Sequence, residues 1–260
     1  MTPEEIQEFW SEQARIHGES PSASWSDHRV IELEIGAIGA RLQPGASLLD
    51  AGCANGYSSA RYAALGARTV GIDYVPEMVK HAESRRKTLP PDVAEKLEFR
   101  VGDITSLEFE DGLFDAVVCT RVIINLPVWS RQMQGLRECG RVLRHGGVLL
   151  LSEATEQGWR RLNAMRREWG LDEIPMPPFN LYLDQDRMLE TVADDFAVEE
   201  VVDFASSYYV ATRVLKPLLA RLAEAAVDVA DPDAEFNRWA AALPSAGDYG
   251  TQKLFVLRRL

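Results

Sequence analysis

Residues 47–60 have the sequence Ser47-Leu48-Leu49-Asp50-Ala51-Gly52-Cys53-Ala54-Asn55-Gly56-Tyr57-Ser58-Ser59-Ala60, and this stretch decides the fold. A short apolar run passes into glycines and then into a helical pattern, which predicts a strand, a tight turn and a helix N-terminus. Gly52 and Gly56 lack the side chain that would keep a ligand away from the backbone. Dinucleotide-binding folds use the same arrangement for a pyrophosphate, which faces free N–H groups at the helix start.

Two details of this stretch argue against a dinucleotide. The glycine spacing is Gly52-x-x-x-Gly56 rather than Gly-x-Gly-x-x-Gly, and Asp50 stands at the end of the strand. A carboxylate at this place repels a pyrophosphate but suits a ligand that carries an ammonium group. An ordinary strand–turn–helix of another α/β protein remains the alternative at this point.

Composition narrows the class of protein. The chain has 260 residues, 46% of them apolar, which suits one large domain or one domain with a lid. A net charge of −12 disfavours nucleic acid as a partner, because phosphate binding needs a basic surface. No apolar run is long enough to span a bilayer, and the first residues carry the acids Glu4 and Glu5 where a signal peptide is basic. The three cysteines and four histidines are scattered, so we expect a cytoplasmic protein with reduced thiols, no membrane contact and no metal site.

The next strand also ends in an acid. Residues 69–73, Thr-Val-Gly-Ile-Asp, are apolar up to Asp73, and Pro76 then marks a helix start. Asp73 follows Gly56 at a spacing close to the ~20 residues that place an acid on a ribose hydroxyl in related folds. A plain helix cap is the alternative role for Asp73.

Three further strands follow in the order expected of a doubly wound fold. They are predicted at 97–101, before Gly102-Asp103-Ile104, at 114–119, before Thr120 and Arg121, and at 147–153. Five apolar strands that alternate with helices predict right-handed βαβ units and a mostly parallel sheet. Open α/β sheets bind ligands at the carboxyl ends of their strands, where these polar residues lie.

This order of motifs resembles the class I S-adenosylmethionine (SAM)-dependent methyltransferases of the small-molecule type. Their first motif is Asp-x-Gly-x-Gly-x-Gly, and Ala54 stands here at the middle glycine. The resemblance covers about residues 44–154. It implies an α/β fold with a doubly wound, seven-stranded, mostly parallel sheet and an antiparallel C-terminal hairpin, for which 196–204 and 253–258 are the predicted strands.

The resemblance also implies SAM as the cofactor. It places Asp73 on the ribose, Asp103 on the adenine amino group and Asp50 toward the ammonium group, while Arg121 suits a carboxylate. The cofactor-binding residues that it implies are Asp50, Gly52, Cys53, Asn55, Gly56, Asp73, Tyr74, Met78, Asp103, Ile104, Thr120 and Arg121.

Catalytic residues are harder to predict, because the methyl group of SAM is already activated and an enzyme mainly has to align it and exclude water. Candidates near the strand ends are Asn125, Glu153, Asn180 and Tyr182. Each has a structural alternative: Asn125 as a helix cap and Tyr182 as a core residue, for example. Because all four map to the ligand side of the sheet, we expect at least one to contact the substrate.

Two segments lie outside the core. The first is residues 1–43, which we predict to form amphipathic helices, the second of them capped by Ser26 or Asp27. The second is a helical insertion at about 205–250 within residues 44–260, which we predict to form the SAM-binding domain. The insertion carries an apolar stripe of Val210, Val214, Leu218 and Leu222, interrupted by Pro217. We interpret both segments as a cap over a substrate pocket, with packing against the sheet edge and a homodimer contact as the alternatives.

The predicted activity is SAM-dependent transfer of a methyl group to O, N or C of a small metabolite by direct in-line displacement. One alternative is an enzyme that consumes SAM without methylation, by an intramolecular cyclisation that releases methylthioadenosine. Another alternative is a non-catalytic SAM-binding partner protein.

Overall fold

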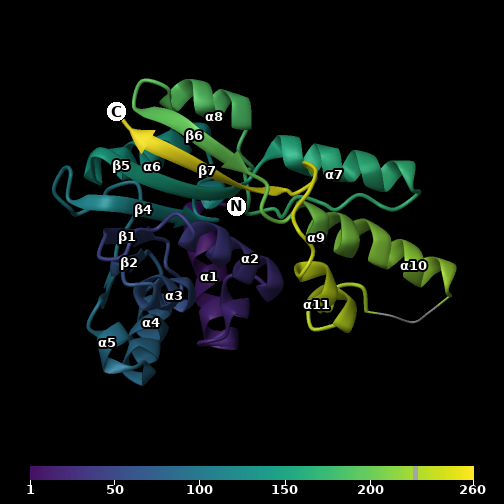
Figure 1. The fold of residues 1–260 in the computed structure, drawn as a ribbon, viewed down its shortest axis with the longest axis horizontal. Coiled ribbons are helices and arrows are strands. Elements are labelled where there is room, and N and C mark those ends of the chain that lie inside the picture. The colour runs from purple at the N-terminus through teal and green to yellow at the C-terminus, as the bar shows by residue number, and fades with distance from the viewer. Residues whose placement is uncertain (225–227) are drawn as a thin grey trace.

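The computed structural model describes residues 1–224 and 228–260, and its centre is one seven-stranded sheet (Figure 1). The strand order is β3-β2-β1-β4-β5-β7-β6, with β7 antiparallel to both β5 and β6 and the other pairs parallel. The strands are β1 (Ser47–Ala51), β2 (Arg68–Asp73), β3 (Leu97–Val101), β4 (Phe114–Thr120), β5 (Leu143–Ala154), β6 (Phe196–Val202) and β7 (Gln252–Arg259). The predicted fold class, including the antiparallel C-terminal hairpin, is confirmed.

Helices cover both faces of the sheet. One face packs on α6 and α8, through Met133, Leu136 and Met188, and the other packs on α2 and α3, through Ile31 and Tyr62. The helices are α1 (Pro3–His17), α2 (His28–Gly39), α3 (Tyr57–Ala64), α4 (Pro76–Thr88), α5 (Pro91–Ala94), α6 (Trp129–Val142), α7 (Glu156–Glu168), α8 (Gln185–Val192), α9 (Ser206–Val210), α10 (Lys216–Leu222) and α11 (Glu235–Ala241), with shorter turns η1 (Pro21–Ala23), η2 (Ile123–Asn125) and η3 (Ala211–Leu215). Among these helices, none has both the length and the apolar character of a membrane span.

The central strand explains why the site forms where it does. Leu48 and Leu49 of β1 have no exposed surface, as expected for a parallel strand that is buried on both faces. β1 pairs with β2 on one side and with β4 on the other, with Asp50 opposite Gly71 and Val118. The carboxyl ends of these three strands therefore meet at one edge of the sheet.

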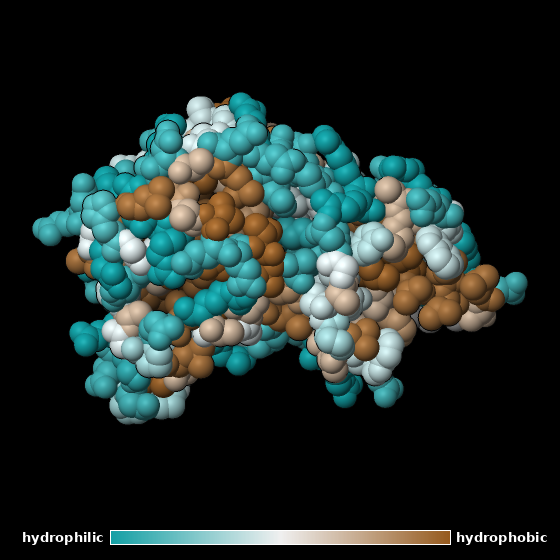
Figure 2. All heavy atoms as spheres, turned by 45° about the horizontal axis from the view of Figure 1, so that its top comes forward, coloured by the Kyte–Doolittle hydropathy of each residue, from teal (hydrophilic) through white to brown (hydrophobic). Residues whose placement is uncertain are grey.

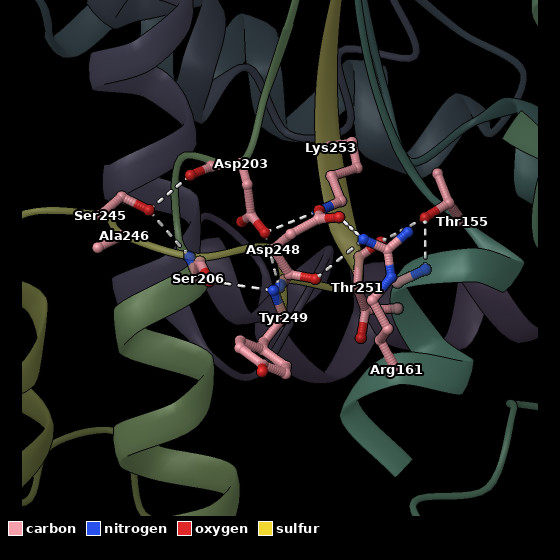
Figure 3. Close-up of polar contacts among 12 residues, drawn as sticks. Thr155, Arg161, Asp203, Ser206, Ser245, Ala246, Asp248, Tyr249, Thr251 and Lys253 are labelled. Atoms are coloured by element: carbon pink, nitrogen blue, oxygen red, sulfur yellow. Dashed lines mark hydrogen bonds and ion pairs between the residues drawn. The ribbon is translucent and has the colours of Figure 1, made fainter. Parts of the chain in front are cut away.

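The insertion between β6 and β7 stands beside α7 at one end of the sheet (Figure 1). Its predicted range of 205–250 includes residues 225–227, which lie outside the described residues. The two ends of the insertion, at Asp203 and Asp248, meet at the ammonium of Lys253 on β7 (Figure 3). The Lys253 side chain is 2% exposed and its Nζ lies 2.7 Å from Asp203 Oδ2, so the start of β7 is fixed by a buried ion pair.

Two predicted helix boundaries are wrong. Pro127 predicts the start of the helix after β4, but α6 begins two residues later, at Trp129, after the 3₁₀ turn η2 has ended at Asn125. Pro217 does not interrupt the insertion helix, because the π-helical turn η3 continues directly into α10. A proline removes the N–H that would bind the carbonyl four residues earlier, that of Arg213, and here the guanidinium of Arg166 donates to this oxygen instead.

The predicted apolar stripe of the insertion is only partly buried. Val214 and Leu218 are buried, at 1% and 9% exposed, whereas Leu222 is 70% exposed. Figure 2 shows apolar side chains gathered at this tip of the molecule, over α10.

Candidate functional site

A cavity lies at the carboxyl ends of β1, β2 and β4, under α1. It is lined by all of the predicted cofactor residues except Gly56, and by Pro3, Ile6 and Trp10 of α1. Other lining residues that the sequence did not indicate are Ser24, Ile31, Ala54, Tyr57, Ser58, Ile72, Gly102, Val122, Leu126, Pro127 and Arg131. The structure therefore brings together, in one hollow, residues from six segments of the chain.

The turn after β1 depends on left-handed backbone. Gly52 has φ +91°, and a Cβ there would lie 2.0 Å from Val122 Cγ2, so only glycine fits. Ala54, at the middle glycine of the motif, has φ 46°, and its N–H donates to Asp73 Oδ2 at 3.0 Å. Alanine therefore preserves the turn but holds a backbone conformation that disfavours a side chain.

Ala54→Gly is expected to stabilise the protein by about 0.5–1 kcal/mol, because relief of the left-handed strain exceeds the added freedom of the unfolded chain. Urea denaturation measures the change. Ala60→Gly, in the right-handed helix α3, is the matched control and should destabilise by about 1 kcal/mol. Equal losses in the two variants would contradict the strain at Ala54.

Gly56 serves packing and does not line the cavity. It is the residue before α3 and has φ +72°. A Cβ there would lie 2.8 Å from Phe99 Cζ and 3.0 Å from Ala82 Cβ. Its lack of a side chain lets α3 approach β3 and α4, which is a different role from the ligand approach predicted for it.

Three carboxylates surround the cofactor cavity. Asp50 Oδ2 accepts a hydrogen bond from the Ser59 hydroxyl at 2.5 Å, and Asp73 Oδ1 accepts from the Val75 N–H at 2.9 Å. Burial raises the pKa of both Asp50 and Asp73 to about 6, although these hydrogen bonds oppose the shift. Asp103 Oδ1 accepts from Thr105 and stays largely exposed.

This donor and acceptor set fits SAM. Each ionised carboxylate has about four acceptor sites, so Asp50 and Asp73 keep capacity for an ammonium group or a hydroxyl beside their present partners. The cavity places these acids against apolar walls such as Met78 and Ile104, which suit an adenine ring. We propose that Asp73, Asp103 and Asp50 hold the ribose, the adenine and the amino acid end, as the resemblance implies.

A second chamber adjoins the cofactor cavity, with a volume of about 270 Å³. The two share the wall residues Trp10, Ser24, Arg121 and Asn125. The other residues that line the chamber are Trp25, Ile124, Ala154, Trp159, Leu162, Ile174, Pro175, Pro177, Phe179, Asn180, Tyr182, Tyr209, Arg213, Thr251 and Gln252. This volume approaches the range of small-molecule sites.

Three of the four predicted catalytic residues line the chamber: Asn125, Asn180 and Tyr182. Asn125 does not cap α6, because its Nδ2 donates to the carbonyl oxygen of Arg121 at 2.7 Å. The side-chain oxygens of Asn125 and Asn180 are buried and have no hydrogen-bond partner among the described residues. Burial raises the pKa of the Tyr182 hydroxyl.

The structure places Glu153 behind the chamber wall. It has no exposed surface, and its Oε1 accepts from the N–H groups of Val122 and Ile123 at 2.8 and 2.7 Å. Burial raises its pKa to about 8 despite these hydrogen bonds. Glu153 thus holds the loop after β4, which carries Arg121 and Asn125.

Arg121 binds a carboxylate of its own chain. Its guanidinium pairs with Glu34 of α2, which also accepts from the Ser152 hydroxyl at 2.6 Å. Burial opposes the charge on Arg121, but the attraction of Glu34 outweighs it and raises the pKa of Arg121. Arg121 lies 5.5 Å from the centre of the Trp25 ring and has φ 55°, a strained backbone conformation at the junction of the two cavities.

Of the two predicted caps, Ser26 or Asp27, Asp27 is the N-cap residue of α2, but its side chain makes no capping hydrogen bond. Its carboxylate instead accepts from the Tyr208 hydroxyl at 2.9 Å and from Arg213 at 2.5 Å. The N-terminal helices and the insertion are therefore joined by a buried ion pair. Sequence reasoning missed Tyr209, Arg213 and the ion pair of Asp27 with Arg213, because no periodic pattern shows which distant segments meet.

The fold, the turn after β1 and the acids at successive strand ends are those of a class I SAM-dependent methyltransferase domain, and they support SAM as its cofactor. A family profile described as "Methyltransferase domain" matches residues 49–151.

Relatives with curated names include a ubiquinone biosynthesis O-methyltransferase of Xanthomonas campestris pv. campestris (strain B100), 35% identical over 48% of this chain and 50% of that protein. A demethylmenaquinone methyltransferase of Beutenbergia cavernae is 38% identical over 50% of this chain and 48% of that protein. The chain thus spans about half the length of these relatives. Among solved structures, a geranyl diphosphate methyltransferase in complex with SAM shares the fold, with a TM-score of 0.56 and 18% identity over 90% of this chain and 87% of that one.

Proposed function

We propose that this protein transfers the methyl group of SAM to an oxygen atom of a small molecule bound in the second chamber. The observation that carries the proposal is the shared wall of Trp10, Ser24, Arg121 and Asn125, through which a cofactor and an acceptor would meet. Relatives named as O-methyltransferases support oxygen as the acceptor atom.

The protein's own part in this reaction is alignment and exclusion of water. When bound, SAM supplies a methyl group that is already activated by its sulfonium. Trp10 and Phe179 pack edge to face at 5.7 Å and close the chamber toward α1. Glu153 and Glu34 hold the strained loop at Arg121, so the wall between the cavities is preorganised, and proximity supplies much of the rate.

The test is to incubate the protein with SAM and a panel of small hydroxyl compounds and to separate the nucleoside products. We expect S-adenosylhomocysteine only when an acceptor is present. Steady release of methylthioadenosine from SAM alone, above the non-enzymatic rate, would overturn methyl transfer and favour cyclisation of SAM.

Asp73→Ala is expected to weaken SAM binding by about 1–3 kcal/mol, through loss of a charge-assisted hydrogen bond to the ribose. Titration calorimetry measures the affinity. Asp92→Ala, on the surface of α5, is the control for removal of one carboxylate. Unchanged affinity in a folded Asp73→Ala protein would exclude the ribose role.

We further propose that residues 1–43 and the insertion cap the site. Pro3, Ile6 and Trp10 line the cofactor cavity, while Tyr209 and Arg213 line the chamber. Hydrogen exchange should show that both segments gain protection when S-adenosylhomocysteine and an acceptor bind. Protection confined to 44–154, with concentration-dependent protection of the apolar tip over α10, would instead support a homodimer contact there (Figure 2).

A further inference from the structure

The wall of the second chamber has an unusual balance of ionisable groups. The described residues that line it include two arginines, Arg121 and Arg213, and no aspartate, glutamate, histidine, lysine or cysteine. The carboxylates of Glu34 and Asp27 pair with these arginines but are not among the lining residues. The wall thus presents guanidinium groups to the chamber, while the carboxylates that balance their charge lie behind it, and this arrangement suits a neutral or anionic molecule better than an ammonium group.

The same wall offers no general base with a suitable pKa. The chamber's tyrosines are the remaining ionisable groups, and burial raises the pKa of both Tyr182 and Tyr209. A base must be deprotonated at the working pH, so these shifts make the two tyrosines poorer bases. An acceptor hydroxyl in this chamber therefore has to lose its proton without help from a lining side chain.

The aromatic lining of the chamber favours a flat molecule. Its rings come from α1, the loop before α2, α7, the loop before α8 and the insertion, and several pack against one another. Trp159 and Tyr182 are edge to face at 6.5 Å, and the Trp159 N–H is fixed by a 2.8 Å hydrogen bond to the carbonyl oxygen of Ile174. Rings held in this way present stacking and edge contacts to a planar apolar ligand.

A cationic donor remains where the two cavities meet. The Nε of Arg121 is buried and has no hydrogen-bond partner among the described residues, although the same guanidinium pairs with Glu34. A buried donor without a partner is rare in native proteins and calls for an explanation. An oxygen anion at the shared wall would supply the missing acceptor.

We propose that the acceptor is a planar molecule with a phenolic or enolic hydroxyl, and that the chamber binds it in its ionised form so that no protein base is needed. This inference rests on the proposed function. The hydroxyl proton passes to solvent on binding, and the oxygen's electron pair then forms the new bond to the methyl carbon as the carbon–sulfur bond breaks and a neutral thioether leaves. Alkyl alcohols, which hold their proton too strongly, and protonated amines are rejected.

The test uses nitrophenols with one or two rings, because their ionised forms absorb at longer wavelength than the neutral forms. Each is titrated into protein saturated with S-adenosylhomocysteine, at a pH below the pKa of the free phenol. We expect the ratio of ionised to neutral phenol to rise at least tenfold on binding, which corresponds to a pKa lowered by one unit. Binding in the neutral form, or no binding of any member of the set, overturns the inference.

A charge change in the wall provides the matched comparison. Asn180→Asp adds a carboxylate to the chamber with little change in shape, and should return the ionised fraction of the bound phenol toward its value in water. Gln43→Glu makes the same charge change on the exposed loop before β1, at the opposite end of the strands, and should leave the tenfold effect intact. Equal ionisation in both variants would show that the wall does not select the anion.

A second assay separates this inference from the proposed function. Benzyl alcohol, benzylamine and the phenols are offered with SAM, and methylated products are measured by mass spectrometry. Binding of an ionised phenol without any methyl transfer would overturn the proposed function and leave the site assignment standing. Methylation of benzyl alcohol or benzylamine, with no ionised phenol bound, would support methyl transfer and overturn the inference.

Discussion

Glu34→Ala is expected to lower the free energy of unfolding by about 3–5 kcal/mol, because it leaves the buried charge of Arg121 without a partner. Glu34 is 1% exposed and also accepts from Ser152, and Gln252 lies at 3.4 Å. The substitution therefore breaks contacts that join α2, β4, β5 and β7 around the shared wall. Urea denaturation at neutral pH measures the loss.

The same helix supplies the control. Glu32 of α2 pairs with Arg61 and accepts from the Tyr57 hydroxyl at the surface, so Glu32→Ala should destabilise the protein by no more than about 1 kcal/mol. Glu34→Gln retains an acceptor for Ser152 but removes the charge, so its effect should fall between the two. Equal losses for Glu34→Ala and Glu32→Ala would show that the pair with Arg121 contributes no more than a surface contact.

Local patterns were sufficient to predict the core of the fold. The strand predicted at 97–101 has those bounds in the structure, and the two C-terminal strands pair antiparallel as predicted. Each strand is short, apolar and closed by a turn residue, so its signal lies within a few neighbouring residues. The error at Pro217 has a non-local origin, because Arg166 of another helix satisfies the carbonyl that Pro217 leaves free.

The cofactor cavity could likewise be predicted from local sequence patterns, whereas the second chamber could not. The cofactor cavity takes most of its polar residues from strand ends, where chain order alone places Asp50, Asp73 and Asp103 at one edge. The second chamber is built from segments far apart in the chain, such as Trp25, Phe179 and Arg213. Amphipathic spacing indicates that such segments have an apolar face, but it does not say which face meets which. For that reason the ion pair between Asp27 and Arg213 could not be predicted from the sequence.

Glu153→Gln is expected to remove a marked pH dependence of stability. Burial raises the pKa of Glu153 in the folded protein to about 8, from an ordinary value of 4.5. Below the ordinary value the proton is bound in both the folded and the unfolded state, and the contribution to stability is fully present. As the pH rises, the unfolded state ionises first, so stability falls by ~1.4 kcal/mol per pH unit until the folded carboxyl ionises near pH 8.

The range from pH 6 to pH 8 isolates this group, because Asp50 and Asp73, with pKa values of about 6, act mainly at lower pH. Over that range the wild-type protein should lose about 2 kcal/mol more than Glu153→Gln. The amide keeps an oxygen for the N–H groups of Val122 and Ile123, so the loop after β4 should persist, and its buried NH₂ changes stability by an amount that does not depend on pH. Urea denaturation at a series of pH values gives the two curves, and Glu95→Gln, on the surface after α5, controls for the loss of one carboxyl. Parallel curves for the wild type and Glu153→Gln would mean that Glu153 is already ionised in the folded protein at pH 6.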